Sequence, residues 1–183
     1  MSSQFKLSSG NGFQLEVRLA YPLPHTVQQA LVSHGVDSTT AVTLAQAKAL
    51  CETLDAPELA HQISPESAAG CGLFHILQAN GTTTAEFFME WFLMQRSTVR
   101  LREHIKAVFH DGHALLEQHE QTFRFSLSAG EHLSLGVIFR TIEEAREGLQ
   151  IVEYTVSQTS LEQVFNGFAA QQQEETGPVR GFN

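Results

Sequence analysis

Apolar and polar side chains alternate with a period of two residues in two segments that lie far apart in the chain. The apolar positions of these segments are Phe13, Leu15, Val17 and Leu19, and then Phe123, Phe125 and Leu127. Such alternation predicts strands that bury one face and expose the other. Their polar positions, Gln14, Glu16, Arg18, Thr122 and Arg124, would then face water or a partner. The fold therefore has to pair strands across a long intervening segment.

Helical spacing of apolar residues dominates the rest of the chain. A long helix is predicted over 85–109, with an aromatic stripe of Phe87, Phe88, Trp91 and Phe92, and it ends before Asp111-Gly112. Strand 113–120 pairs with strand 121–127 as a hairpin. A capping box of Ser128 and Glu131 opens a helix that carries Leu135, Ile138, Phe139 and Ile142 and ends at Gly148. A strand over 149–156 and a last helix from Ser160 follow.

The predicted fold class is α+β. Without residues 26–84 the order is β-α-β-β-α-β with a terminal helix, which is the ferredoxin-like, split β-α-β pattern. We expect a ferredoxin-like domain over 5–25 and 97–170, a helical insertion over 26–96 and a flexible tail over 171–183.

Short helices are predicted within the insertion. Thr26 would cap one that ends at Gly35, and Asp37 or Ser38 would cap a second. A third, over 73–77, would end at Gly81.

Charge and cysteine content exclude several classes of protein. The 183 residues include 20 acidic and 11 basic ones, a net charge of −9, so the chain should bind neither nucleic acid nor an anionic membrane. Two cysteines, Cys51 and Cys71, are read as small buried hydrophobic residues. No signal peptide or apolar stretch of membrane-spanning length is present, so we expect a cytoplasmic chain that does not insert into the membrane.

Motifs for catalysis and cofactors are missing. The sequence has no G-x-x-x-x-G-K-[ST], G-x-G-x-x-G, G-x-S-x-G or C-x-x-C, so we expect no enzyme, no cofactor and no ATP binding. The histidines do not suggest a metal site, since His113 and His119 would sit at opposite ends of one strand. The segment around Gly81 resembles a degenerate EF-hand at best, because Ile76 and Phe87 occupy positions that require oxygen ligands. The carboxylates Glu143, Glu144 and Glu147 should form a solvated helix face.

One long segment resembles a known family. GLQIVEYTVSQTSLEQVFNGFAA, from Gly148 to Ala170, is similar to the end of the cytosolic half of subfamily A ABC transporters, which reads I-x-[DE]-Y-S-[VI]-S-Q-[TS]-[TS]-L-[DE]-Q-V-F. FKLSSGNGFQLEVRL at the start of the chain and FHDGHALLEQHEQTFRFSL, from Phe109 to Leu127, are similar to further family segments. Thr155 departs from the family's usual serine.

The resemblance implies a regulatory domain, the C-terminal one of a lipid exporter, that docks on nucleotide-binding domains and tunes their ATPase on the cytosolic face of a membrane. Its interaction residues would be Tyr154, Ser157, Gln158, Thr159, Leu161, Glu162, Val164, Phe165 and Phe168. Two readings of this segment stay open, since its apolar stripe could equally cover the domain's own sheet and its Ser-Gln-Thr turn could simply cap a helix. The alternative functions are a free-standing ferredoxin-like small-molecule sensor or adaptor and, third, a metal-dependent enzyme.

Overall fold

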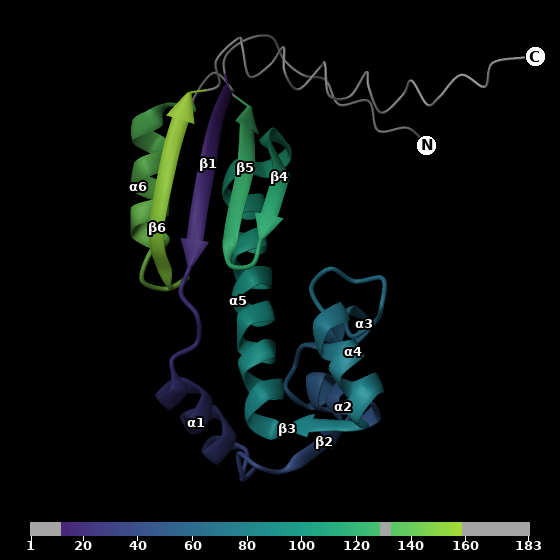
Figure 1. Ribbon diagram of the computed structural model, residues 1–183. Coiled ribbons are helices and arrows are strands. Elements are labelled where there is room, and N and C mark those ends of the chain that lie inside the picture. Colours follow the sequence, from purple (N-terminus) through teal and green to yellow (C-terminus); the bar gives the residue numbers. More distant parts are fainter. Residues whose placement is uncertain (1–11, 129–132, 159–183) are drawn as a thin grey trace, which may run out of the picture. The chain divides into compact units, whose positions relative to one another are not determined.

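The computed structural model describes residues 12–128 and 133–158, and these form two compact units (Figure 1). Of the described residues, the first unit contains 12–18, 105–128, 133–147 and 151–158, and the second contains 19–104 and 148–150. The predicted α+β class is confirmed, with strands and helices in the first unit and mainly helices in the second. None of the helices in the described ranges is long and apolar enough to cross a membrane.

A four-stranded antiparallel sheet forms the first unit. Its strands are β1 (Gly12–Leu19), β4 (His113–His119), β5 (Thr122–Ser128) and β6 (Ile151–Gln158), in the spatial order β4-β5-β1-β6. Strands β1 and β5 pair in a register that places Leu15 opposite Phe125 and Val17 opposite Phe123. The alternation seen in the sequence is thus confirmed, because all four of these side chains are buried.

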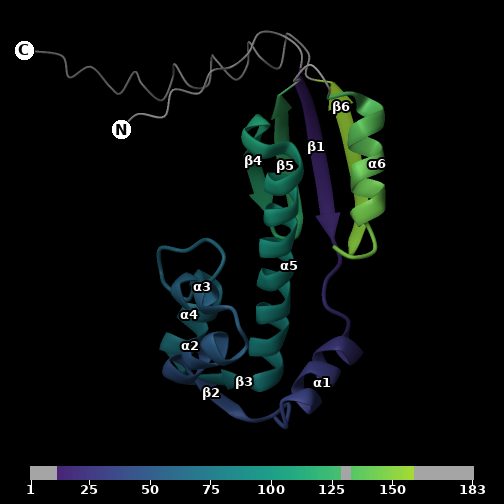
Figure 2. The same ribbon diagram turned by 180° about the vertical axis from the view of Figure 1, so that it is seen from behind.

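Two helices cover one face of this sheet, as Figures 1 and 2 show. Helix α6 (Leu135–Ala145) supplies Ile138 and Ile142, both fully buried. The end of helix α5 (Ala85–Phe109) supplies Ile105 and Phe109, after which the short 3-10 helix η1 (His110–Gly112) leads into β4. The predicted helix boundaries at 85 and 109 are confirmed.

The predicted capping box of Ser128 and Glu131 is wrong. Ser128 is the last residue of β5 and pairs with Gly12 of β1, so it belongs to the sheet. The cap of α6 is Ser134, whose hydroxyl accepts a hydrogen bond from the backbone N–H of Val137 at 3.3 Å. Glu131 lies outside the described residues.

The second unit contains the helices α1 (Pro24–Ser33), α2 (Leu44–Thr53), α3 (Pro57–Gln62) and α4 (Cys71–Asn80) and the greater part of α5. Two short strands, β2 (Ala41–Thr43) and β3 (Thr82–Thr84), pair in an antiparallel manner. The sequence predicted neither strand nor α3, because elements of three to six residues carry too little periodicity to be recognised.

Both predicted caps in this region are wrong. Helix α1 begins at Pro24, two residues before Thr26, because the fixed φ angle of proline suits the first helical position. Asp37 and Ser38 precede β2, and the cap of α2 is Thr43, which forms a capping box with Gln46. The predicted end of α4 at Gly81 is confirmed, since this glycine has a positive φ of 76°.

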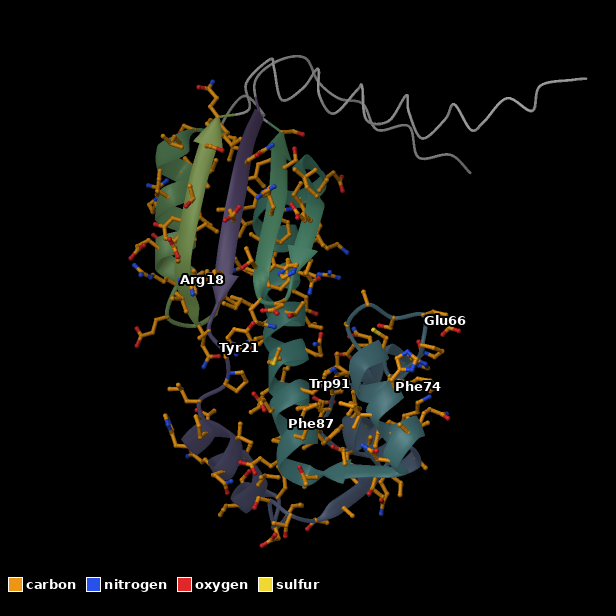
Figure 3. The ribbon with its side chains drawn as sticks, in the orientation of Figure 1. Arg18, Tyr21, Glu66, Phe74, Phe87 and Trp91 are labelled. Atoms are coloured by element: carbon orange, nitrogen blue, oxygen red, sulfur yellow. The ribbon has the colours of Figure 1, made fainter. Side chains whose placement is uncertain are left out.

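Aromatic side chains of α5 form the centre of the helical core. Phe88 and Phe92 are 1% exposed, with ring centroids 6.1 Å apart, and the indole N–H of Trp91 donates to the carbonyl oxygen of Ala69 at 3.0 Å. Phe87, the fourth member of the predicted stripe, is 41% exposed. Figure 3 labels Phe87 and Trp91 on the helix. The stripe is therefore a packing surface, apart from Phe87.

We predict that Phe92→Ala destabilises the second unit by about 3–5 kcal/mol, because it leaves a cavity among fully buried neighbours. Phe87→Ala is the matched control, since it removes the same ring from an exposed position of the same helix. Thermal unfolding followed by circular dichroism should show a large decrease in melting temperature for Phe92→Ala and a small decrease for Phe87→Ala. Equal losses would contradict this packing.

Gly70 gives a second test of the helical core. A Cβ at this position would lie 1.9 Å from the carbonyl oxygen of Gln62, a backbone atom that cannot move aside alone. We predict that Gly70→Ala costs about 1–3 kcal/mol or more through this clash. Gly72→Ala, where no atom lies within 4 Å, should be neutral or slightly stabilising in α4. Chemical denaturation of the two variants and the unchanged chain measures the difference in their free energies of unfolding.

Candidate interaction site

Three of the predicted interaction residues lie in the described part of the chain, all in β6. Tyr154 is half-buried, and Ser157 and Gln158 are exposed at the end of the strand. The other six lie outside the described residues: Thr159, Leu161, Glu162, Val164, Phe165 and Phe168. The structure thus places the beginning of the predicted segment on an edge strand of the sheet, next to α6.

Tyr154 connects β6 to α6 through both parts of its side chain. Its hydroxyl donates a hydrogen bond to Oε2 of Glu143 at 2.8 Å, and its ring lies against Phe139, with centroids 5.7 Å apart and planes inclined by 56°. Desolvation, followed by the contact with the Glu143 carboxylate, raises the pKa of Tyr154. The hydroxyl therefore stays protonated at neutral pH and acts as a donor.

Glu143 and Arg146 extend this network. The hydrogen bond from Tyr154, and next the one from Arg146, lower the pKa of the Glu143 carboxyl, so it remains ionised. Arg146 lies 3.2 Å from Glu143 Oε1 and donates to the carbonyl oxygens of Ile151 at 3.5 Å and Val152 at 3.2 Å. Arg146 thereby links the Glu143 side chain of α6 to the backbone at the start of β6.

The sequence predicted that Glu143 would lie on a solvated helix face, without a specific partner. This side chain is exposed, but it also accepts hydrogen bonds from two partners. The spacing of three residues between Glu143 and Arg146 was a signal for their ion pair. Nothing in the sequence indicated that Tyr154 contacts Glu143, because that contact depends on β6 packing beside α6.

An apolar surface, the α6–β6 rim, adjoins this network. We define it as Leu135, Phe139, Val152 and Tyr154. Leu135 is 45%, Phe139 41% and Val152 43% exposed. The helical stripe predicted for α6 is thus only half buried, since Ile138 and Ile142 face the sheet while Leu135 and Phe139 lie at its border with solvent. Large apolar side chains grouped in this way favour contact with another protein surface.

The open face of the sheet differs from the rim in its chemistry. Ion pairs connect neighbouring strands there: Arg18 lies 2.8 Å from Glu153, and Arg124 lies 3.0 Å from Glu16 and 2.9 Å from Glu117. All five side chains remain substantially exposed, so each pair contributes little to stability. The polar face predicted from alternation is confirmed, and its charges are already paired within the sheet.

Metal-ligating and nucleophilic groups are dispersed. No three His, Cys, Asp or Glu side chains within residues 12–128 and 133–158 are placed to hold a metal ion. Cys51 is fully buried, and desolvation raises the pKa of its thiol to about 11, while Cys71 is only half-buried. His104 has a buried Nε2 without a hydrogen-bond partner, and burial lowers its pKa. These groups are separate from the network around Tyr154.

Comparisons with known proteins agree with the resemblance in the sequence. Residues 94–158 match the family described as "ABCA1-like, C-terminal R1 regulatory domain". The chain is 39% identical over 69 residues to ATP-binding cassette sub-family A member 2 of Homo sapiens. That match covers 35% of this chain and 3% of the human protein. It is 43% identical over 58 residues to retinal-specific phospholipid-transporting ATPase ABCA4 of Bos taurus. That match covers 32% of this chain and 2% of the bovine protein. No solved structure matches.

The matched range contains the whole site described above. It includes α6, β6 and the α6–β6 rim, and it ends at Gln158, before Thr159. The predicted resemblance to subfamily A ABC transporters is confirmed, because residues 94–158 match the ABCA1-like, C-terminal R1 regulatory domain family, although the chain spans only 2–3% of the length of the relatives it matches.

Proposed function

We propose that this chain acts as a non-catalytic regulatory domain of a subfamily A ABC transporter that moves lipid, and that it docks on a nucleotide-binding domain and tunes its ATPase. The observation that carries the proposal is the α6–β6 rim, an exposed apolar surface inside the range matched to the regulatory-domain family. The site of action would be the cytosolic face of the membrane.

The chemistry of the rim supports a protein partner. Phe139 and Tyr154 present aromatic surface that is partly immobilised by their mutual contact, so little side-chain entropy is lost on binding. Ser157 and Gln158 supply exposed polar groups at one border of this surface. An apolar centre with a polar border is the usual composition of a specific interface. The proposed interaction segment continues from these residues through Thr159, Leu161, Glu162, Val164, Phe165 and Phe168.

The finer fold that we propose for the first unit is the ferredoxin-like one. It is supported by the order of elements, β1, α5, β4, β5, α6 and β6, once the helical region between β1 and α5 is set aside. The strand order β4-β5-β1-β6, with the first and last strands adjacent, is consistent with two interlocked β-α-β units.

We further propose the domain division as 5–25 with 97–170, an insertion over 26–96 and a tail over 171–183. Support comes from the separate core of the second unit. The insertion is proposed as a helical region that is degenerate EF-hand-like at best. In its first half the Gln46 side chain accepts hydrogen bonds from the backbone N–H and the hydroxyl of Thr43, both at 2.9 Å, and so caps a helix.

Replacing residues 26–96 with a short Gly/Ser linker tests this division. We expect the remaining chain to fold, because the sheet keeps Leu15, Val17, Phe123, Phe125, Ile138 and Ile142 as its own core. A dispersed amide spectrum and one cooperative thermal transition would support it. Loss of both would show that the insertion and the sheet share one core.

Binding of the full chain to a purified nucleotide-binding domain of a subfamily A transporter tests the function. We expect Phe139→Ser to weaken binding at least about tenfold, as for central interface aromatics. The control is Val32→Ser, which removes an apolar side chain that is 75% exposed in the second unit. Calorimetry measures both affinities, and the ATPase rate should lose its dependence on the chain only with Phe139→Ser. Absence of binding, or equal effects of the two variants, would contradict the proposal.

A further inference from the structure

A pocket of about 300 Å³ lies in the second unit, away from the residues used above. Its lining includes two arginines of α5, Arg96 and Arg100, together with the hydroxyl-bearing residues Thr26 and Ser97. Leu93 and Tyr21 add apolar surface, and Figure 3 labels Tyr21 near α5. The pocket therefore combines two fixed positive charges with polar donors and an apolar wall.

The two arginines lie one helical turn apart. Like charges at this spacing repel each other and destabilise a helix. One of them is held in place, because Nη2 of Arg100 donates to the carbonyl oxygen of Gly148 at 3.1 Å. Within residues 12–128 and 133–158 the side chain of Arg96 forms no ion pair, whereas Arg18, Arg124 and Arg146 all do. This local excess of positive charge is unusual in a chain with a net charge of −9.

No carboxylate lines this pocket. Planar guanidinium groups bind phosphate oxygens through paired hydrogen bonds, and the hydroxyls of Ser97 and Thr26 can donate further ones. A dianionic group would also relieve the repulsion between the two arginines.

We propose that this pocket binds a phosphate monoester, with the phosphate between Arg96 and Arg100 and the organic part against Leu93 and Tyr21. The phosphate group could belong to an anionic phospholipid headgroup or to a soluble ester, and the chemistry of recognition is the same. The inference does not depend on the proposed docking function, because the pocket and the α6–β6 rim share no residue.

The experiment uses the full chain and two probes. Glycerol 3-phosphate is titrated by calorimetry, and vesicles of phosphatidylcholine with and without phosphatidic acid are tested by co-sedimentation. We expect saturable binding of at least one probe. Binding of the soluble ester alone would identify a soluble ligand, binding only to the phosphatidic acid vesicles would identify a headgroup, and binding of both would show that the phosphate suffices.

Charge-matched variants separate a built site from general attraction. Arg96→Gln and Arg100→Gln should each weaken binding at least about tenfold, through loss of hydrogen bonds to a charged group. Arg140→Gln in α6 removes the same charge at an exposed position of the first unit and should leave affinity unchanged. Arg96→Lys should keep part of the affinity, because charge remains but the paired geometry is lost. Failure of both probes to bind, or an equal loss with Arg140→Gln, would overturn the proposal.

Discussion

The pairing of β1 with β5 is the contact on which the first unit depends. It joins residues near the start of the chain to residues that follow the long helix α5, and its register sets Leu15 against Phe125 and Val17 against Phe123. A shift by one residue would turn these buried side chains toward solvent and the charged ones toward the helices. The same pairing allows most of the helical unit, including the greater part of α5, to be inserted in the chain between β1 and β5 without interrupting the sheet.

The two faces and the edge of this sheet have different capacities for binding. On the open face, Arg18 and Arg124 are already engaged with carboxylates of neighbouring strands. A sensor that dimerised through this face would have to desolvate those ion pairs, which costs free energy. At the edge formed by β6 and α6, the rim consists of exposed apolar side chains and only one ion pair, Glu143 with Arg146, lies beside it. This contrast favours the edge as the docking surface.

Periodicity predicted the elements that bury a long stripe or one complete face. The strands β1 and β5 and the helix α5 were all recognised from residues such as Val17, Phe125 and Phe92. The caps were not, because serine and threonine are common before helices and only the folded chain decides which one is used. The sequence predicted Ser128 as the cap where the structure has Ser134, and Asp37 or Ser38 where it has Thr43.

The candidate site was predicted in part. Tyr154, Ser157 and Gln158 came from the family resemblance, while the partners of Tyr154 could be seen only in the structure. Glu143 and Phe139 lie on the same helix and meet Tyr154 because β6 packs against it, and no local pattern records that contact. The pocket at Arg96 and Arg100 was not predicted, because its lining comes from segments far apart in the chain and no local motif marks it.

The two thiols of the chain provide an internal reporter of folding. With a pKa of about 11, only about one Cys51 side chain in ten thousand is ionised at pH 7, and the thiolate is the reactive form. Cys71 is closer to solvent. A thiol-specific reagent added in a short pulse should therefore label Cys71 in the native chain and reach Cys51 only when the core of the second unit opens. The rate of that labelling would report opening of this unit separately from the sheet, which has no cysteine.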